Sequence, residues 1–158
     1  MLPNVDLETP TLKPCSIMDN PFTSDLTWLM HRAVQVLTND FDAVCAEVGL
    51  KDMRDTLVLA VCGDGIDRTQ IEIAETLGLD KTTLMSILDR LEKQEFLVRN
   101  TDPRNRRVRI PCTTPAGQSV LDEALSRRDE RVSNTLSDFN EDEIGALRTQ
   151  LWRIATAR

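Results

Sequence analysis

The chain has 158 residues, of which 41% are hydrophobic and 28% charged, and its formal net charge is −7. This length can bury one sizeable core, and the composition is that of an ordinary soluble protein rather than a disordered chain. No apolar run reaches the roughly 18 to 20 residues of a membrane span, and the start, MLPNVDLETPTLKPC, lacks the basic-then-apolar order of a secretory signal. We therefore expect a cytoplasmic protein with no membrane partner.

Residues 1–23 are predicted to form an extended N-terminal arm rather than a domain. Four of the seven prolines, Pro3, Pro10, Pro14 and Pro21, lie in this segment. Proline removes a backbone donor and disfavours helix in the residue before it, so a long helix is excluded here.

The next segment has the apolar spacing of helices. Residues 24–50 repeat apolar side chains every three or four positions and end at Gly49, which predicts one long helix. A second helix is expected from Met53 to about Cys62, followed by the glycine-containing loop GDGID.

Two short helices joined by a tight turn follow, and they suggest a helix-turn-helix. Thr69 and Glu72 form a capping-box pattern, Gly78 ends the first helix, and Asp80 can cap a second one over KTTLMSILDRLEKQ. The second helix has an apolar face, which consists of Leu84, Ile87, Leu88 and Leu91. Its opposite face has short polar side chains with basic residues beside them: Thr82, Ser86, Asp89 and Lys93, flanked by Thr83, Met85 and Arg90. Such a face suits the major groove, although on an isolated helix it is more often a solvated surface.

A β-hairpin is expected directly after this helix. FLVRNT alternates like a strand, DPRNRR is predicted to be a turn, and RVRIPCT is predicted to be the second strand. The stretch from Asp67 to Cys112 holds nine Lys/Arg against eight Asp/Glu, so the rest of the chain carries the whole negative balance. A turn that projects Arg104, Arg106 and Arg107 suits a narrow, electronegative minor groove. The fold class is therefore mainly α with a small β-hairpin wing, a winged helix-turn-helix.

Two more helices are expected after the hairpin. Thr114 and Pro115 start one that runs to about residue 137, and Asn140 starts the last. The last helix has a narrow apolar seam with spacings of three, four and three, formed by Ile144, Leu147, Leu151 and Ile154. The seam is predicted to lie at a dimer interface, while burial in the core of the same chain is the alternative.

The segment TQIEIAETLGLDKTTLMSILDRLEKQEFLVRNTDPRNRRVRIPCTTPAGQSVLDEA resembles the MarR family of bacterial transcriptional regulators, including its wing motif Asp-x-Arg-x-x-Arg. The resemblance covers residues 55 to 126. It implies a bacterial, nucleoid-associated homodimer whose terminal helices interlock and whose partners are double-stranded DNA with a pseudo-palindromic operator and a small-molecule effector. The corresponding regions are 24–50 and 114–158 for dimerisation and 51–113 for DNA binding.

The resemblance also assigns residues to the DNA-binding site. It places the minor-groove arginine at Arg104, its positioning aspartate at Asp102 and the second basic position of the motif at Arg107. Major-groove and phosphate contacts fall on Lys81, Thr82, Thr83 and Ser86, and we add Arg90 and Arg106 from their positions on the helix and the hairpin. The family usually has a glycine where this chain has Glu95, at the end of the recognition helix.

For the effector, the resemblance implies a pocket between the dimerisation helices and the DNA-binding lobe that accepts small aromatic, often anionic compounds. The nearest candidates are Trp28, His31 and Arg32 on the first helix, with Met53 on the second. Core packing for Trp28 and solvation for Arg32 are the alternatives.

Three functions remain open: a DNA-binding repressor relieved by a ligand, a thiol-based redox-sensing DNA-binding regulator, and a winged-helix module for protein contacts. An enzyme is not expected, because the chain has no nucleophile elbow, phosphate loop or metal-ligand cluster. Four widely spaced cysteines, Cys15, Cys45, Cys62 and Cys112, and one histidine predict neither a metal site nor a disulfide framework, and no cofactor is expected. The organic-hydroperoxide branch of the family pairs its reactive cysteine with tyrosines, and this chain has no tyrosine.

Overall fold

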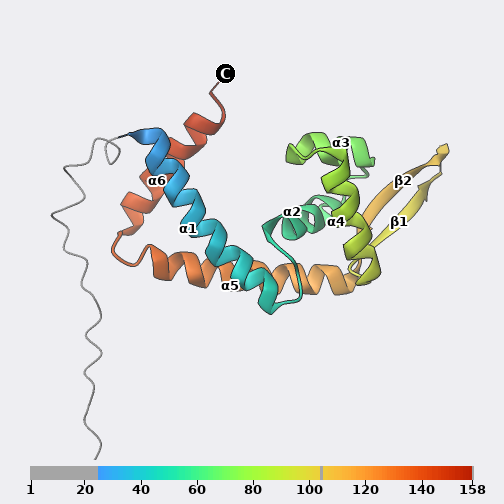
Figure 1. Ribbon diagram of the computed structural model, residues 1–158, viewed down its shortest axis with the longest axis horizontal. Coiled ribbons are helices and arrows are strands. Elements are labelled where there is room, and N and C mark those ends of the chain that lie inside the picture. The colour runs from blue at the N-terminus through green and yellow to red at the C-terminus, as the bar shows by residue number, and fades with distance from the viewer. Residues whose placement is uncertain (1–24, 104, 158) are drawn as a thin grey trace, which may run out of the picture. The chain divides into compact units, whose positions relative to one another are not determined.

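A computed structural model describes residues 25–103 and 105–157 of the chain. The predicted N-terminal arm, Cys15 and Arg104 lie outside the described residues. The elements in chain order are α1 (Leu26–Glu47), α2 (Met53–Gly63), α3 (Gln70–Leu77), α4 (Lys81–Lys93), β1 (Leu97–Asp102), β2 (Asn105–Thr113), α5 (Pro115–Thr135) and α6 (Glu141–Ala155) (Figure 1). The chain divides into two compact units, Met1–Val36 and Leu37–Arg158, so α1 begins in the first and ends in the second.

The helix-turn-helix is formed by α3 and α4, as predicted. The Thr69 and Glu72 side chains each accept a backbone N–H of the other residue, at 3.3 and 2.7 Å, which satisfies two amides that the first turn of α3 leaves unpaired. Gly78 ends α3 in the left-handed conformation with φ 62°. Asp80 then caps α4 by accepting the N–H of Thr83 at 2.9 Å.

The core of the second unit explains the apolar face of α4. Its four apolar residues, Leu84, Ile87, Leu88 and Leu91, are each at most 3% exposed. They pack in one cluster with Val58 and Leu59 of α2, Ile73 of α3 and Leu97 of β1. The predicted fold class, mainly α with a hairpin wing, is confirmed.

The turn between α4 and the wing has the left-handed backbone that the family usually assigns to glycine. Glu95 has φ 62° and is the one described non-glycine residue with positive φ. The N–H of Phe96 returns to the carbonyl of Leu91 at 3.0 Å, which closes the helix end. Thr114 fixes the same turn from the other side, because its hydroxyl donates to the Glu95 carbonyl at 2.7 Å and its N–H to the Phe96 carbonyl at 3.0 Å.

The wing is the antiparallel pair β1–β2, which lies beside α4 and projects outward from it (Figure 1). The turn predicted over 102–107 is shorter in the structure, because Asn105 already pairs with Asp102. The next pair is Thr101 with Arg109, so the register shifts between the two pairs and residues 106–108 have no partner on β1. Arg106 and Arg107 therefore lie in an irregular part of β2 rather than in the turn itself.

The helices after the wing differ in how they pack within the second unit. Gly117 in the first turn of α5 meets the α4–wing turn so closely that an added Cβ would lie 2.0 Å from the Phe96 carbonyl oxygen. Further along α5, Arg127 and Arg131 each pair with Glu47, at 3.0 and 3.1 Å. By contrast, α6 has no buried residue. Among the described residues, no helix is long and apolar enough to cross a membrane.

Candidate nucleic-acid interface

The exposed side of α4 presents hydroxyls and a lysine near the start of the helix. Lys81, Thr82 and Ser86 are exposed, and Thr83 is half-buried. The Thr83 hydroxyl donates to Asp80 at 2.5 Å, and this hydrogen bond, with that from the Thr83 N–H, holds the pKa of the Asp80 carboxyl below its usual value. Thr83 is thus engaged in capping α4, whereas the hydroxyls of Thr82 and Ser86 have no hydrogen-bond partner among the described residues.

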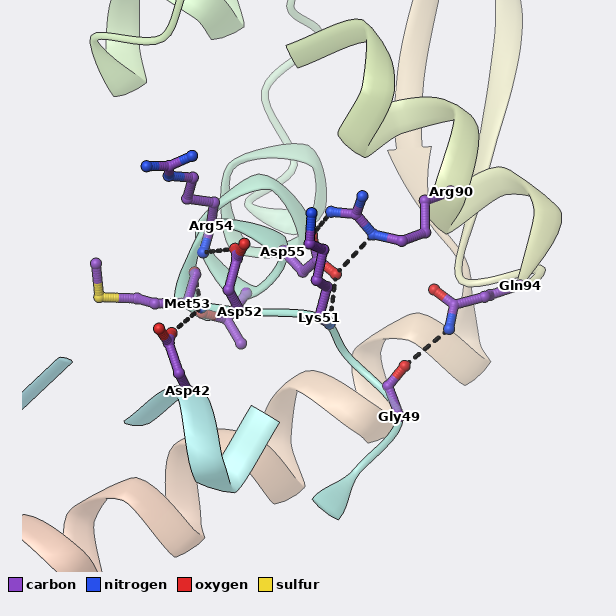
Figure 2. A network of polar contacts seen from close by, with 10 residues as sticks. Asp42, Gly49, Lys51, Asp52, Met53, Arg54, Asp55, Arg90 and Gln94 are labelled. Carbon is purple, nitrogen blue, oxygen red and sulfur yellow. Dashed lines mark hydrogen bonds and ion pairs between the residues drawn. The ribbon is translucent and has the colours of Figure 1, made fainter. Parts of the chain in front are cut away.

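Arg90 lies on the same helix but its guanidinium is bound to α2. The Asp55 carboxylate accepts Arg90 Nε at 3.2 Å and also Arg90 Nη2, which makes a two-point ion pair (Figure 2). Asp55 is fully buried, and it also accepts the backbone N–H of Lys51 at 2.9 Å. The hydrogen bonds that the Arg90 guanidinium donates to Asp55 raise the pKa of Arg90. This pair ties α4 to α2, so Arg90 has a structural partner in the absence of DNA.

A second ion pair ties the wing to α4. Arg99 of β1 binds Asp89 of α4, and Arg99 Nε lies 3.6 Å from Glu92 Oε2. The single positive charge of Arg99 thus offsets part of the negative charge of two carboxylates on the wing side of the recognition helix, where unpaired negative charge would repel DNA.

The wing residues of the predicted site lie at and next to its tip. Asp102 is 7% exposed at the end of β1, opposite Asn105. Arg106 and Arg107 are exposed, and the Arg107 N–H donates to Asn105 Oδ1 at 3.1 Å. Arg104 lies outside the described residues, so its predicted minor-groove role stays a prediction.

The distribution of ion pairs separates the α4–wing surface from α5. On α5, Arg127 pairs with Glu47 and Glu123, Arg128 with Asp129, and Arg131 with Glu47. On α4 and the wing, five cations have no carboxylate within ion-pair distance among the described residues: Lys81, Lys93, Arg106, Arg107 and Arg109. A protein with a net charge of −7 thus leaves unneutralised positive charge on its recognition helix and hairpin.

The predicted effector residues are divided between the two units. In the first unit, Trp28 is 38% exposed, Arg32 donates to Gln35 Oε1 at 2.8 Å, and His31 Nε2 lies 3.0 Å from Gln35 Nε2. In the second unit, Met53 lines a hollow of about 190 Å³ with Thr38, Asp42, Asp52 and Arg54. The three α1 residues therefore share one helix, while their grouping with Met53 stays a prediction.

Two of the described thiols, those of Cys45 and Cys62, differ from the thiol of a reactive sensor. Cys45 is fully buried, and burial, with the nearby Asp42, raises its pKa from 9.0 to about 12. Burial and the neighbouring Cys112 raise the pKa of Cys62 to about 12 as well. Because the thiolate is the nucleophile, both groups are disfavoured for peroxide chemistry at neutral pH. No group of three or more potential metal ligands occurs within the described parts of the chain.

Four residues at this surface could not be identified from the sequence alone. Asp55, Arg99 and the two cations Lys51 and Arg54 had no periodic or motif signal, because their roles depend on contacts between segments distant in the chain. Asp55 and Arg90 are 35 positions apart.

Comparison with known proteins agrees with this architecture. A model of the MarR family matches residues 48–108, which hold α2, α3, α4 and most of the wing. The HTH-type transcriptional regulator YsmB of Bacillus subtilis, itself uncharacterised, is 27% identical over 88 residues. That alignment covers 56% of this chain and spans only 60% of the length of YsmB.

Solved structures match over most of the chain. The transcriptional repressor CouR, solved bound to a 23-mer DNA duplex, is 30% identical with a TM-score of 0.73, and the match covers 83% of this chain and 92% of that one. BpsR of Bordetella bronchiseptica, whose DNA binding is regulated by 6-hydroxynicotinic acid, has a TM-score of 0.76 at 21% identity over 88% of this chain and 99% of that one, which is a likeness of fold. These relatives are transcriptional regulators and not enzymes, as expected from the sequence. The fold, the family model and the match to CouR together show that the chain belongs to the MarR family.

Proposed function

We propose that the chain is a homodimeric, sequence-specific DNA-binding transcriptional regulator, that it acts as a repressor, and that a small aromatic or anionic ligand relieves repression. The observation that supports DNA binding is the group of cations on α4 and the wing that have no carboxylate partner among the described residues, whereas the arginines of α5 are paired with carboxylates. An acidic body with a basic interface restricts a polyanion to one docking orientation.

In this proposal α4 occupies the major groove and the wing the adjacent minor groove. The exposed Thr82 and Ser86 hydroxyls contact base edges or phosphates, and Lys81 contacts phosphate. Arg104 enters the minor groove, with Asp102 as its positioning residue, and Arg106 and Arg107 contact the flanking backbone. Arg90 acts mainly by holding α4 against α2 through Asp55.

The homodimer is supported by the apolar seam on α6. Leu147, Leu151 and Ile154 are 42 to 46% exposed, and no residue of this helix is buried within the chain. Ile144 is half-buried on the same seam. A second copy would cover this surface, and its two-fold symmetry would place two recognition helices about one turn of DNA apart, ~34 Å.

The DNA-binding proposal is tested by measuring affinity for duplex DNA over a series of salt concentrations. If α4 and the wing neutralise phosphates, log K should fall linearly with log salt with a slope of about −0.9 per contact. An affinity that does not change with salt would exclude phosphate contacts as the basis of binding.

Two variants separate the roles of wing and helix. Arg104→Ala should weaken binding by about 1 to 3 kcal/mol, chiefly on sites with a narrow A·T-rich minor groove. Lys81→Ala should weaken binding to all sequences alike, because a phosphate contact carries no base information. Equal losses on every sequence for both variants would contradict the assignment of Arg104.

The effector is proposed to bind near Trp28, His31, Arg32 and Met53. It loosens DNA binding only if it prefers a spacing of the recognition helices that the operator does not fit, and a coupling of about 1 to 3 kcal/mol corresponds to a 5- to 150-fold loss of affinity. Arg32→Ala should abolish the response to an aromatic acid and leave ligand-free operator binding unchanged. If peroxide releases the DNA instead, and one Cys→Ser substitution abolishes that release, the redox alternative holds.

A further inference from the structure

Outside the recognition helix and the wing, Lys51 and Arg54 are among the described cations that lack a carboxylate partner. Lys51 and Arg54 flank the start of α2, and both are exposed. Their backbone amides are fixed, because the Lys51 N–H donates to Asp55 Oδ2 at 2.9 Å and the Arg54 N–H to Asp52 Oδ1 at 2.9 Å. Neither charged side-chain group has an ion pair or hydrogen bond among the described residues. Two positive charges are thus held close together in the chain without neutralisation.

These side chains line a hollow of about 270 Å³ between α2 and α4, which we call the α2–α4 hollow. Its α4 side includes Thr82 and Ser86, the two exposed hydroxyls of the recognition helix. Asp52 is the one carboxylate among the lining residues, so the lining keeps a positive balance. The hollow therefore offers ammonium, guanidinium and hydroxyl donors around a space large enough for a phosphate group.

The amides at the start of α2 are already occupied, so an anion in the hollow would bind to side chains. Asp42 accepts the Met53 N–H at 2.8 Å, and Asp52 and Asp55 accept the N–H groups of Arg54 and Lys51 (Figure 2). The guanidinium of Arg90, which also lines the hollow, is bound to Asp55. Lys51 and Arg54 are consequently the two lining cations whose charge is available to a ligand.

We infer that the α2–α4 hollow binds a backbone phosphate of the DNA that flanks the major groove entered by α4. The inference rests on the proposed function, because it extends the same interface from the recognition helix to the start of α2. Thr82 and Ser86 line the hollow and also belong to the exposed face of α4 for which DNA contact is proposed. A phosphate that borders this groove therefore lies within reach of the cations on the opposite wall. Such a contact fixes the position of α4 on the duplex and is independent of base sequence.

The test compares the salt dependence of DNA binding by the full-length protein and two variants. The double variant Lys51→Gln, Arg54→Gln removes both cations of the hollow. The control Arg148→Gln removes an exposed cation of α6 that also lacks a partner among the described residues. One phosphate lost per protomer makes two per dimer, so the salt slope of the double variant should be shallower by about 1.8. The change should be the same on a selected operator and on a random duplex.

The outcomes distinguish this inference from the proposed function. A wild-type slope near zero would overturn DNA binding itself. A steep wild-type slope that the double variant shares with Arg148→Gln would overturn the inference and leave the proposed function standing. If the double variant has a shallower salt slope on only one of the two duplexes, its cations recognise bases, and the inference would again be overturned. The charge-conserving variant Lys51→Arg, Arg54→Lys should keep the wild-type slope, and an equal loss in that variant would indicate a packing role instead.

Discussion

Replacing Arg90 with methionine should cost stability rather than a phosphate contact. The substitution keeps the length of the side chain and removes the guanidinium that binds Asp55. Asp55 is fully buried and receives three hydrogen bonds, two from Arg90 and one from the Lys51 N–H. After the substitution, the carboxylate would keep only the backbone donor.

The expected loss follows from this geometry. Removing one partner of a buried ion pair costs about 3 to 5 kcal/mol, because the remaining charge is left uncompensated. The side chain of Arg90 is 26% exposed, so water can reach part of the site and the lower end, about 3 kcal/mol, applies. The double variant Asp55→Asn, Arg90→Met should recover most of this loss, because asparagine keeps an acceptor for Lys51 N–H and no charge remains buried.

The assay is urea denaturation of wild type, both single variants and the double variant at one protein concentration, since dimer stability depends on concentration. The salt slope of DNA binding is measured for the same proteins under conditions where each is folded. Arg90→Met should leave that slope unchanged. The reasoning fails if Arg90→Met loses less than about 1 kcal/mol, or if its salt slope falls as it would for a lost phosphate contact.

Three further outcomes are expected. Glu95→Gly should stabilise the protein by about 1 kcal/mol, because the left-handed backbone at φ 62° is strained for glutamate, and should therefore raise the urea midpoint; an unchanged or lower midpoint would contradict this. Leu147→Glu should abolish the dimer and DNA binding together, by placing an unpaired charge in the α6 seam, whereas an intact dimer in sedimentation would place the interface elsewhere. Since the pKa of Cys62 is raised to about 12, iodoacetamide at pH 8 should alkylate it much more slowly in the folded protein than in urea, and equal rates would show that the thiol is not protected.

Helix boundaries could be predicted because the signals that set them are local. The capping pairs Thr69–Glu72 and Asn140–Glu143 lie three residues apart, and both form the reciprocal hydrogen bonds expected of such pairs. Thr114 likewise caps α5 in front of Pro115. In each case one side chain satisfies a nearby amide, so no knowledge of the tertiary structure was needed.

The structure of the wing tip could be predicted only in part from local sequence. Pro103 and Asn105 favour a turn, which led to a predicted loop over 102–107. In the structure, the pairing of Asp102 with Asn105 carries the ladder to the tip, and the register shift leaves residues 106–108 unpaired. The turn is therefore shorter than the local pattern predicted, and the register shift that leaves residues 106–108 unpaired had no signal in the sequence.

The partners of charged residues could not be predicted from the sequence. Arg90 was assigned to the DNA-binding site because it is a basic residue beside the polar face of a helix, yet its guanidinium is bound by a carboxylate 35 positions earlier in the chain. Lys51 and Arg54 stand in an unremarkable segment, and only folding brings them beside Thr82 and Ser86. Gly117 is required because of the Phe96 carbonyl, which no local pattern reveals.

The most direct test of the central claim is selection of binding sites from a pool of random duplex DNA by the full-length protein. If the protein is a dimer that reads sequence with α4 and the wing, the selected sites should share an inverted repeat whose half-sites are about 10 bp apart, centre to centre. The flanks contacted by the wing should be enriched in A·T pairs, and this enrichment should disappear with Arg104→Ala. A selected pool with no common sequence, or with a single unrepeated half-site, would contradict the account.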